Sequence, residues 1–217
     1  MQYFEEKGIY IGAHISSVGN VTDKMFDNTS FDVDELQSAS KKDFPVLDDE
    51  AGEKMKALIL KAKNDLDSVG GTIECMAVGV PAGVGEPMFE GLENVIAQSV
   101  FAIPAVKGIE FGLGFGSSFL FGSQNNDEYY FDESGNVKTK TNNAGGICGG
   151  LSTGMPIAFR VSMKPTPSIS KAQNTVNLVS GKNDVLEIHG RHDPCIVQRA
   201  VPCIEAAMAL AIAQFVL

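Results

Sequence analysis

The sequence predicts an α+β fold on three observations. Few segments have the 3.6-residue apolar periodicity of a helix, and those that do are long. Short runs of alternating or β-branched residues come in neighbouring groups separated by turn residues, as antiparallel strands do. No segment repeats with a period of about 20–50 residues, which argues against a repeat architecture. Long helices with grouped strands favour α+β over a strict alternation of strands and helices.

The helices can be placed by their end signals. Gly70 ends the first, after a stretch whose apolar residues recur on one face. Pro104 ends the second, because proline cannot continue a helix. Pro194 suits the first turn of the third, where its missing N–H costs nothing, and Asp193 suits its N-cap. The expected helices are residues 48–69, 89–103 and 194 to near the C-terminus.

The strands are expected where apolar residues alternate or cluster between turn residues. Two pairs should form hairpins, with turns at 134–136 and 181–184. His14 lies on the first strand and is expected to be an ordinary hydrogen-bonded histidine. The polar stretch 20–44 is expected to be a mobile or weakly helical connection. The expected strands are residues 7–15, 72–80, 107–112, 127–131, 137–141, 157–163, 175–179 and 185–189.

Composition limits the class of protein. The chain of 217 residues is 44% hydrophobic and 20% charged, which is typical of one soluble globular domain, here 1–217. A net charge of −10 argues against a nucleic-acid partner bound through a basic surface. The apolar stretch 200–217 contains Glu205 and Gln214, so we expect a buried helix and no membrane partner. The N-terminus lacks the apolar core of a secretory signal. The four cysteines form no C-x-x-C pair, so we expect free thiols and a cytoplasmic location.

Two glycine-rich stretches differ from the known nucleotide-binding motifs. Residues 112–116 lack the spacing of the dinucleotide fingerprint, and 142–150 lack the Gly-Lys-Ser/Thr ending of a Walker loop. Tight turns explain such glycines, although a close backbone approach to a flat, phosphorylated cofactor is the alternative. His189 and His192 have no further ligands at metal-binding spacing, so no metal is expected.

The stretch 190–195 places chargeable residues between two predicted elements. Arg191, His192 and Asp193 should be presented together at a strand-to-helix junction, in front of the positive end of a helix. An aspartate N-cap with a neighbouring ion pair explains these residue types without any function. A binding or catalytic site is the alternative.

Five motifs decide between these alternatives, because together they resemble chorismate synthases. They occur in the order and at the separations of that family, and the resemblance runs from about Tyr3 to the C-terminus. Several motifs in register are far more specific than any one of them. The motifs are residues 83–87, 103–110, 141–147, 164–169 and 190–195, the last followed by Arg-Ala-Val-Pro at 199–202.

The resemblance implies a fold and a reaction. The family fold is a four-layer β-α-α-β sandwich, with antiparallel sheets packed on central helices, and it assembles as a homotetramer. This chain would be the C-terminal portion of that fold. The reaction removes phosphate and a ring proton from 5-enolpyruvylshikimate 3-phosphate in a 1,4-anti elimination, which gives chorismate in the shikimate pathway. Reduced FMN is required although no net redox change occurs.

The resemblance also implies site residues. Asp193 would be the catalytic carboxylate that works with the flavin N5 in moving the ring proton, and Arg191 would neutralise substrate charge. Relatives often have asparagine in place of Pro104, so only a backbone contact is carried over there. The implied FMN contacts are Pro104, Ala105, Gly149, Lys164, Pro165, Thr166, Pro167, Ser168 and Arg191.

One part of the family pattern has no match in this sequence. Family members carry a further segment with a Gly-Glu-Ser-His-Gly motif, a second catalytic histidine and arginines that line the phosphate site. His14, His189 and His192 do not correspond to those histidines by motif. We therefore expect no chorismate synthase activity from this chain alone, together with part of the fold and weak FMN affinity. The alternative is a non-catalytic flavin-binding or oligomerisation module.

Overall fold

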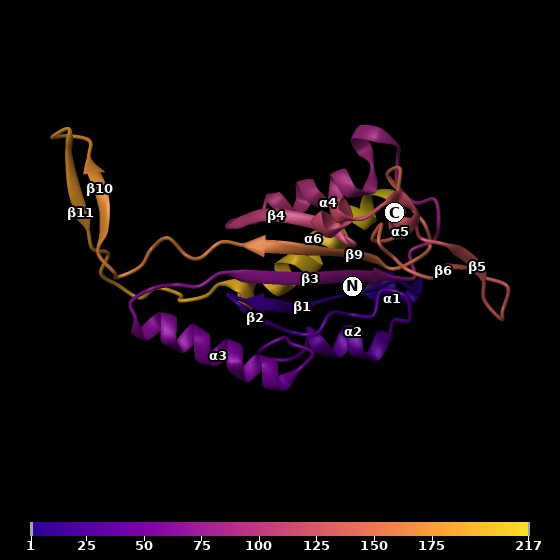
Figure 1. Ribbon diagram of the computed structural model, residues 1–217, viewed down its shortest axis with the longest axis horizontal. Coiled ribbons are helices and arrows are strands. Elements are labelled where there is room, and N and C mark those ends of the chain that lie inside the picture. The colour runs from indigo at the N-terminus through magenta and orange to yellow at the C-terminus, as the bar shows by residue number, and fades with distance from the viewer. Residues whose placement is uncertain (1, 217) are drawn as a thin grey trace.

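A five-stranded antiparallel sheet organises the computed structural model, which describes residues 2–216. The strand order is β2-β1-β3-β9-β4, and each neighbouring pair is antiparallel (Figure 1). The α+β class with antiparallel pairing is therefore confirmed. The strands are β1 (Tyr10–Val18), β2 (Val21–Thr22), β3 (Gly71–Val78), β4 (Val106–Phe111) and β9 (Ile157–Met163).

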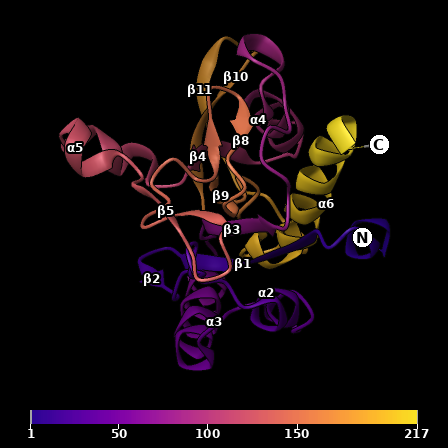
Figure 2. The same ribbon diagram turned by 90° about the vertical axis from the view of Figure 1, so that its right-hand side faces the viewer.

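One face of the sheet is apolar and lies under two helices, α4 (Leu92–Phe101) and α6 (Val197–Val216) (Figure 2). Ile15, Ile73 and Val161 stand directly opposite one another on β1, β3 and β9 and are fully buried. Burying each such side chain contributes about 1.5–3 kcal/mol. The sheet and this helix pair correspond to a β layer and an α layer of the expected sandwich.

The other face is partly covered by α2 (Val33–Ala39), while α3 (Asp49–Asn64) lies along β1 and β2. A Cβ at Gly12 would collide with the backbone of Leu36, so only glycine lets α2 approach β1 this closely. The side chain of Asp32 caps α2 by accepting a bond from the amide of Asp34 at 2.8 Å. Of the two expectations for 20–44, a mobile or a weakly helical connection, the helical one is found at α2, where Leu36 and Ala39 are buried.

Short elements extend from the two ends of the sheet. The hairpin β10–β11 projects from the end where β9 stops, and β5–β6 lies at the opposite end (Figure 1). The single-domain assignment for 1–217 stays a prediction. The short elements are α1 (Gln2–Glu6), η1 (Met88–Glu90), η2 (Gly114–Phe119), α5 (Gly122–Asn125), β5 (Tyr129–Phe131), β6 (Val137–Thr139), β7 (Ile147–Cys148), β8 (Leu151–Ser152), β10 (Gln173–Asn177) and β11 (Lys182–Leu186).

Two helix boundaries differ from the sequence prediction. Helix α3 ends at Asn64 rather than near Gly70, since Leu66 has a φ of 58°, which no α-helix accommodates. Helix α4 begins only at Leu92, so Phe89 lies outside it and is exposed.

The turn of the β10–β11 hairpin was predicted at 181–184 but lies at 178–181. The Asn177 side chain accepts bonds from the amides of Val179 at 3.0 Å and Ser180 at 3.1 Å, and this reverses the chain earlier. Gly181 completes the turn with a φ of 67°. Lys182 therefore starts the second strand instead of lying in the turn.

Helix α6 is long and apolar enough, by length and composition, to cross a membrane. In this structure it packs along the sheet with Ile204 and Met208 fully buried. Glu205 turns back to accept a bond from the amide of Ala13 at 2.8 Å. The predicted buried helix is thus found, with an ionisable side chain bonded to a strand edge.

Candidate functional site

A hollow of about 220 Å³ lies between the segments that lead into and out of the β10–β11 hairpin. We call it the junction hollow, because the end of α3, the turn after β9 and the segment before α6 meet there. It is lined by Lys63, Leu66, Asp67, Ser168, Ile169, Ser170, Gly190, Arg191, His192, Asp193 and Pro194.

The turn 164–168 leaves β9 beside Ala105. The amide of Lys164 donates to the Ala105 carbonyl at 2.9 Å, which joins Pro104 and Ala105 to the turn. Ala105 has a φ of 72°, a left-handed conformation that costs a non-glycine residue roughly 1–2 kcal/mol. Strained backbone of this kind gathers at functional sites, where the surroundings hold it in place.

The helix of the strand-to-helix junction begins later than predicted. Helix α6 starts at Val197, so Asp193 is not its N-cap. The Pro194 carbonyl accepts a bond from the amide of Val69 at 2.8 Å, and this tertiary contact holds the segment before α6 in a non-helical conformation. The carboxylate of Asp193 instead pairs with Arg199 Nη1 at 2.6 Å. The explanation without any function had two parts. The predicted N-cap at Asp193 is wrong, and the predicted ion pair is confirmed.

Two polar atoms near the junction hollow are buried without a hydrogen-bond partner in residues 2–216. They are Nε2 of His192 and Oγ1 of Thr166. Such orphaned atoms are rare in folded proteins, because each costs about 1–3 kcal/mol when nothing replaces water. A ligand with polar groups is one way to supply the missing partners.

Gly149 does not join this site within one copy of the chain. It lies in the turn between β7 and β8, before β9 begins, whereas Lys164 follows the end of β9. Its neighbour Gly150 packs against Glu86 and Gly91, at the start of α4. Of the predicted site residues, Ser168, Arg191 and Asp193 line the junction hollow. Pro104, Ala105 and 164–167 are linked to it only through the chain and the Lys164–Ala105 bond, and Gly149 lies at the other end of the sheet.

A second polar cluster was not foreseen from the sequence. Buried His14 places Nδ1 3.2 Å from Asp23 Oδ2 and Nε2 2.8 Å from Glu74 Oε2. Burial alone would lower the pKa of His14, but the hydrogen bonds to Asp23 and Glu74 outweigh it and raise that pKa above 6.5. The ordinary bonded histidine expected from the sequence is confirmed, with two carboxylate partners that the sequence did not indicate.

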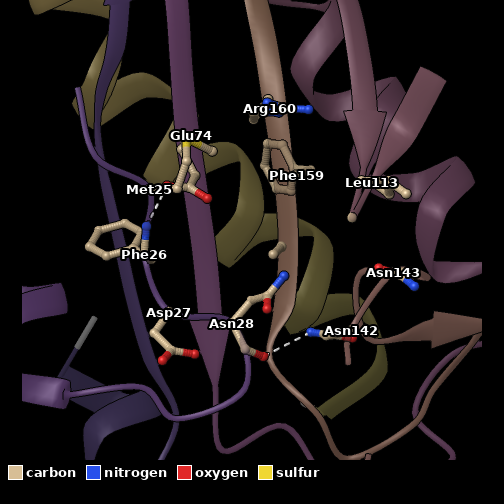
Figure 3. A pocket seen from close by; sticks show the side chains of 12 residues that line it. Met25, Phe26, Asp27, Asn28, Glu74, Leu113, Asn142, Asn143, Phe159 and Arg160 are labelled. Carbon is tan, nitrogen blue, oxygen red and sulfur yellow. Dashed lines mark hydrogen bonds between the residues drawn. The ribbon is translucent and has the colours of Figure 1, made fainter. Parts of the chain in front are cut away.

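The same cluster extends across the sheet as a row of His14, Glu74, Arg160 and Glu110, which we call the polar row. Each stands directly opposite the next on β1, β3, β9 and β4. Arg160 Nη2 pairs with Glu110 Oε1 at 2.7 Å. Figure 3 shows the hollow of about 240 Å³ beside this row, where the Phe26 amide donates to Glu74 at 2.9 Å. The signal in the sequence was that each of these residues alternates with an apolar one.

No group of three or more His, Cys, Asp or Glu side chains is placed to hold a metal ion anywhere in residues 2–216. The four cysteines, all in the described part of the chain, are free thiols. Burial raises the pKa of the Cys195 thiol, beside the junction hollow, which disfavours a reactive thiolate there.

Comparison with known proteins agrees with the resemblance seen in the motifs. The family model for chorismate synthase matches residues 1–217. The chorismate synthase of Lancefieldella parvula is 45% identical over 222 residues, which cover 98% of this chain and 58% of that protein. The enzyme of Methanococcus maripaludis is 52% identical over 165 residues, 76% of this chain and 44% of that protein.

The fold agrees as well. A crystal structure of chorismate synthase matches with a TM-score of 0.80 and 29% identity, over 99% of this chain and 59% of that one. The chain thus spans at most about three fifths of the length of these relatives. The motifs, the family model and the fold lead to one conclusion: the chain belongs to the chorismate synthase family.

Proposed function

We propose that the junction hollow is part of a flavin-dependent lyase site. The reaction is the 1,4-anti elimination of phosphate from 5-enolpyruvylshikimate 3-phosphate, which yields chorismate. The observation that carries this proposal is the convergence of Ala105, the turn 164–168 and the segment 191–193 at one end of the sheet. Three segments distant in sequence meet there, and each holds residues that the family motifs assign to FMN.

The donor set of the hollow fits part of FMN. Arg191 offers a permanently charged fork for oxyanions, and Ser168 adds a hydroxyl donor. The orphaned Nε2 of His192 adds a group that still lacks a partner. A volume of about 220 Å³ is below the roughly 300–1,000 Å³ of complete small-molecule sites, so this hollow holds only one portion of the cofactor.

The residues of this chain have distinct roles in the proposed reaction. When bound, reduced FMN supplies the electron-rich centre that helps remove a poorly acidic ring hydrogen. Arg191 offsets the charge that develops as phosphate leaves. The carboxylate of Asp193 accepts or returns a proton, and its pairing with Arg199 keeps it at the mouth of the hollow.

We propose further that this chain alone does not turn over the substrate. None of its three histidines matches the catalytic histidines of the family by motif. Only His192 lines the junction hollow, because His14 is bonded to two carboxylates at the polar row and His189 is exposed. The complete enzyme is proposed to be a cytoplasmic homotetramer. Exposed apolar residues at the hairpin tip, Leu178 and Val179, support an assembly and favour an oligomerisation module as the second candidate.

A flavin titration tests the proposal. FMN fluorescence should be quenched by the whole chain, and Arg191→Ala and Lys164→Ala should each weaken binding by about tenfold or more. Lys182→Ala is the matched control, because it removes an exposed lysine from the projecting hairpin. Absence of quenching would contradict the flavin site and favour a purely structural role for the chain. Chorismate formation by the purified chain with reduced FMN would refute its inactivity.

A further inference from the structure

The linker between α3 and β3, residues 65–70, contributes Leu66 and Asp67 to the lining of the junction hollow. It also bonds two further segments that reach the hollow, the turn 164–168, which ends at the lining residue Ser168, and the segment 190–194; we call these two segments its walls. The Ser68 hydroxyl donates to the carbonyl of Thr166 at 2.7 Å. The next amide, that of Val69, donates to the carbonyl of Pro194 at 2.8 Å. Two adjacent residues thus bond one wall each, and the family motifs identified in the sequence include neither of them.

The turn 164–168 depends on bonds from outside because of its own sequence. Pro165 and Pro167 have no N–H groups, so the turn cannot bond across itself in the usual way. The Lys164 amide anchors its start on Ala105. The bond from Ser68 anchors its middle, at the residue between the two prolines.

The linker is also fitted closely and tied at its other side. A Cβ at Gly70 would lie 2.5 Å from the Met163 carbonyl oxygen and 3.0 Å from the Pro165 ring, so the glycine lets the linker approach the end of β9 and the start of the turn. Lys171, just after the turn, donates from its amide to the Leu66 carbonyl and pairs through Nζ with Asp67, both at 3.1 Å. The linker therefore has bonds to the turn, to its exit and to the segment before α6.

We infer that this linker sets the spacing between the two walls of the site, with Ser68 as the positioning residue. The inference rests on the proposed function, since it concerns the geometry of the same FMN-binding hollow. Ser68 acts through the Thr166 peptide and needs no contact with the cofactor. Loss of its hydroxyl would free the middle of a turn that has few bonds of its own, and displacements of about 1 Å in a binding site are costly.

The test compares Ser68→Ala with Ser68→Thr and Thr139→Val in the full chain. Ser68→Ala should raise the FMN dissociation constant about tenfold, and Ser68→Thr, which keeps the hydroxyl, should restore it to within about threefold. Thr139→Val removes a hydroxyl-to-carbonyl bond of the same kind, from Thr139 to Thr141, at the opposite end of the sheet. It should leave FMN affinity unchanged while lowering the unfolding temperature to a similar extent.

Amide hydrogen exchange gives a second readout that needs no flavin. Ser68→Ala should speed exchange at Lys164 and Val69, the amides that anchor the two walls, and Thr139→Val should not. Unchanged exchange at both amides, or equal FMN affinities for wild type and Ser68→Ala, would overturn the inference. If the wild type binds no FMN, the proposed function fails, and the exchange measurement still decides the role of Ser68.

Discussion

The two faces of the central sheet differ in chemistry, although neighbouring residues of the same strands form them. One face carries apolar side chains and the other carries a row of polar and charged ones. Beneath α4 and α6, Ile15, Ile73 and Val161 meet across β1, β3 and β9 with no polar atoms. One residue along each strand, His14, Glu74 and Arg160 meet on the other face. Packing on the first face requires only complementary shape and apolar area, whereas burial on the second face requires a hydrogen-bonding or ionic partner for each charge.

This difference bears on how the fold is specified. A slip of one residue in any of these strands would carry a charged side chain of the polar row into the apolar core. The polar row also holds the chain that covers it through Asp23, the partner of His14, which accepts bonds from the amides of Leu47 at 2.6 Å and Asp48 at 2.9 Å. We therefore expect the apolar face to supply most of the stability, and the polar row to fix register and the path of the covering loops.

The apolar face should show the largest effect of a single substitution. Phe159 is 1% exposed and packs near Phe111, with ring centroids 5.7 Å apart and the ring planes tilted by 52°. Phe159→Ala should lower the free energy of unfolding by about 3–5 kcal/mol in urea titrations, because it leaves a cavity that the sheet cannot close. Phe115→Ala, at an exposed phenylalanine, is the control and should change it by less than about 0.5 kcal/mol. Similar losses for both variants would contradict the contrast.

The polar row should make the free energy of unfolding depend on pH. Because the folded pKa of His14 is raised, its stabilisation is complete below 6.5 and is lost as pH rises through the folded pKa. Between pH 6.5 and 8 the free energy of unfolding should fall by up to about 1.4 kcal/mol per pH unit. The measurement stays below pH 8, since burial raises the pKa of Cys75 well above its ordinary value and adds a second loss at higher pH.

His14→Gln should remove this slope, because the amide does not titrate. His189→Gln, on an exposed histidine, is the matched control and should keep it. A slope that survives in His14→Gln would show that another group titrates in this range. At the acid end, the lowered pKa of Asp23 predicts a separate loss of stability only below its unfolded value of 3.8.

The sequence predicted the sheet better than the loops, because local signals define strands. Apolar alternation after Pro156 and before Lys164 gave strand 157–163, which matches β9. The hairpin turn was misplaced because one side chain, that of Asn177, decides where the chain reverses. The start of α6 was misplaced because a tertiary bond from Val69 competes with a local N-cap.

The candidate site divides in the same way. Motifs identified the turn 164–168 and the segment 191–193, and Ser168, at the end of that turn, lines the junction hollow together with 191–193. Ser68 had no local signature, since its importance comes from a bond to Thr166, far along the chain. The pairing of His14 with Asp23 and Glu74 could not be predicted either, because these residues meet only after β1, β3 and the covering loop have assembled.

The smallest effect on stability is expected at the ion pair of Asp193 and Arg199. This pair is far more exposed than the pair of His14 and Glu74, so it tests how exposure changes the contribution of paired charges. The side chains of Arg199 and Asp193 are 71% and 36% exposed, whereas those of His14 and Glu74 are 0% and 6% exposed. Arg199→Ala should therefore change the free energy of unfolding by less than about 1 kcal/mol. About 0.5 M NaCl should abolish that difference, while the pH slope of His14 should persist because buried pairs are screened much less. A salt-insensitive loss of several kcal/mol in Arg199→Ala would mean that the junction before α6, like the polar row, is held by its charges.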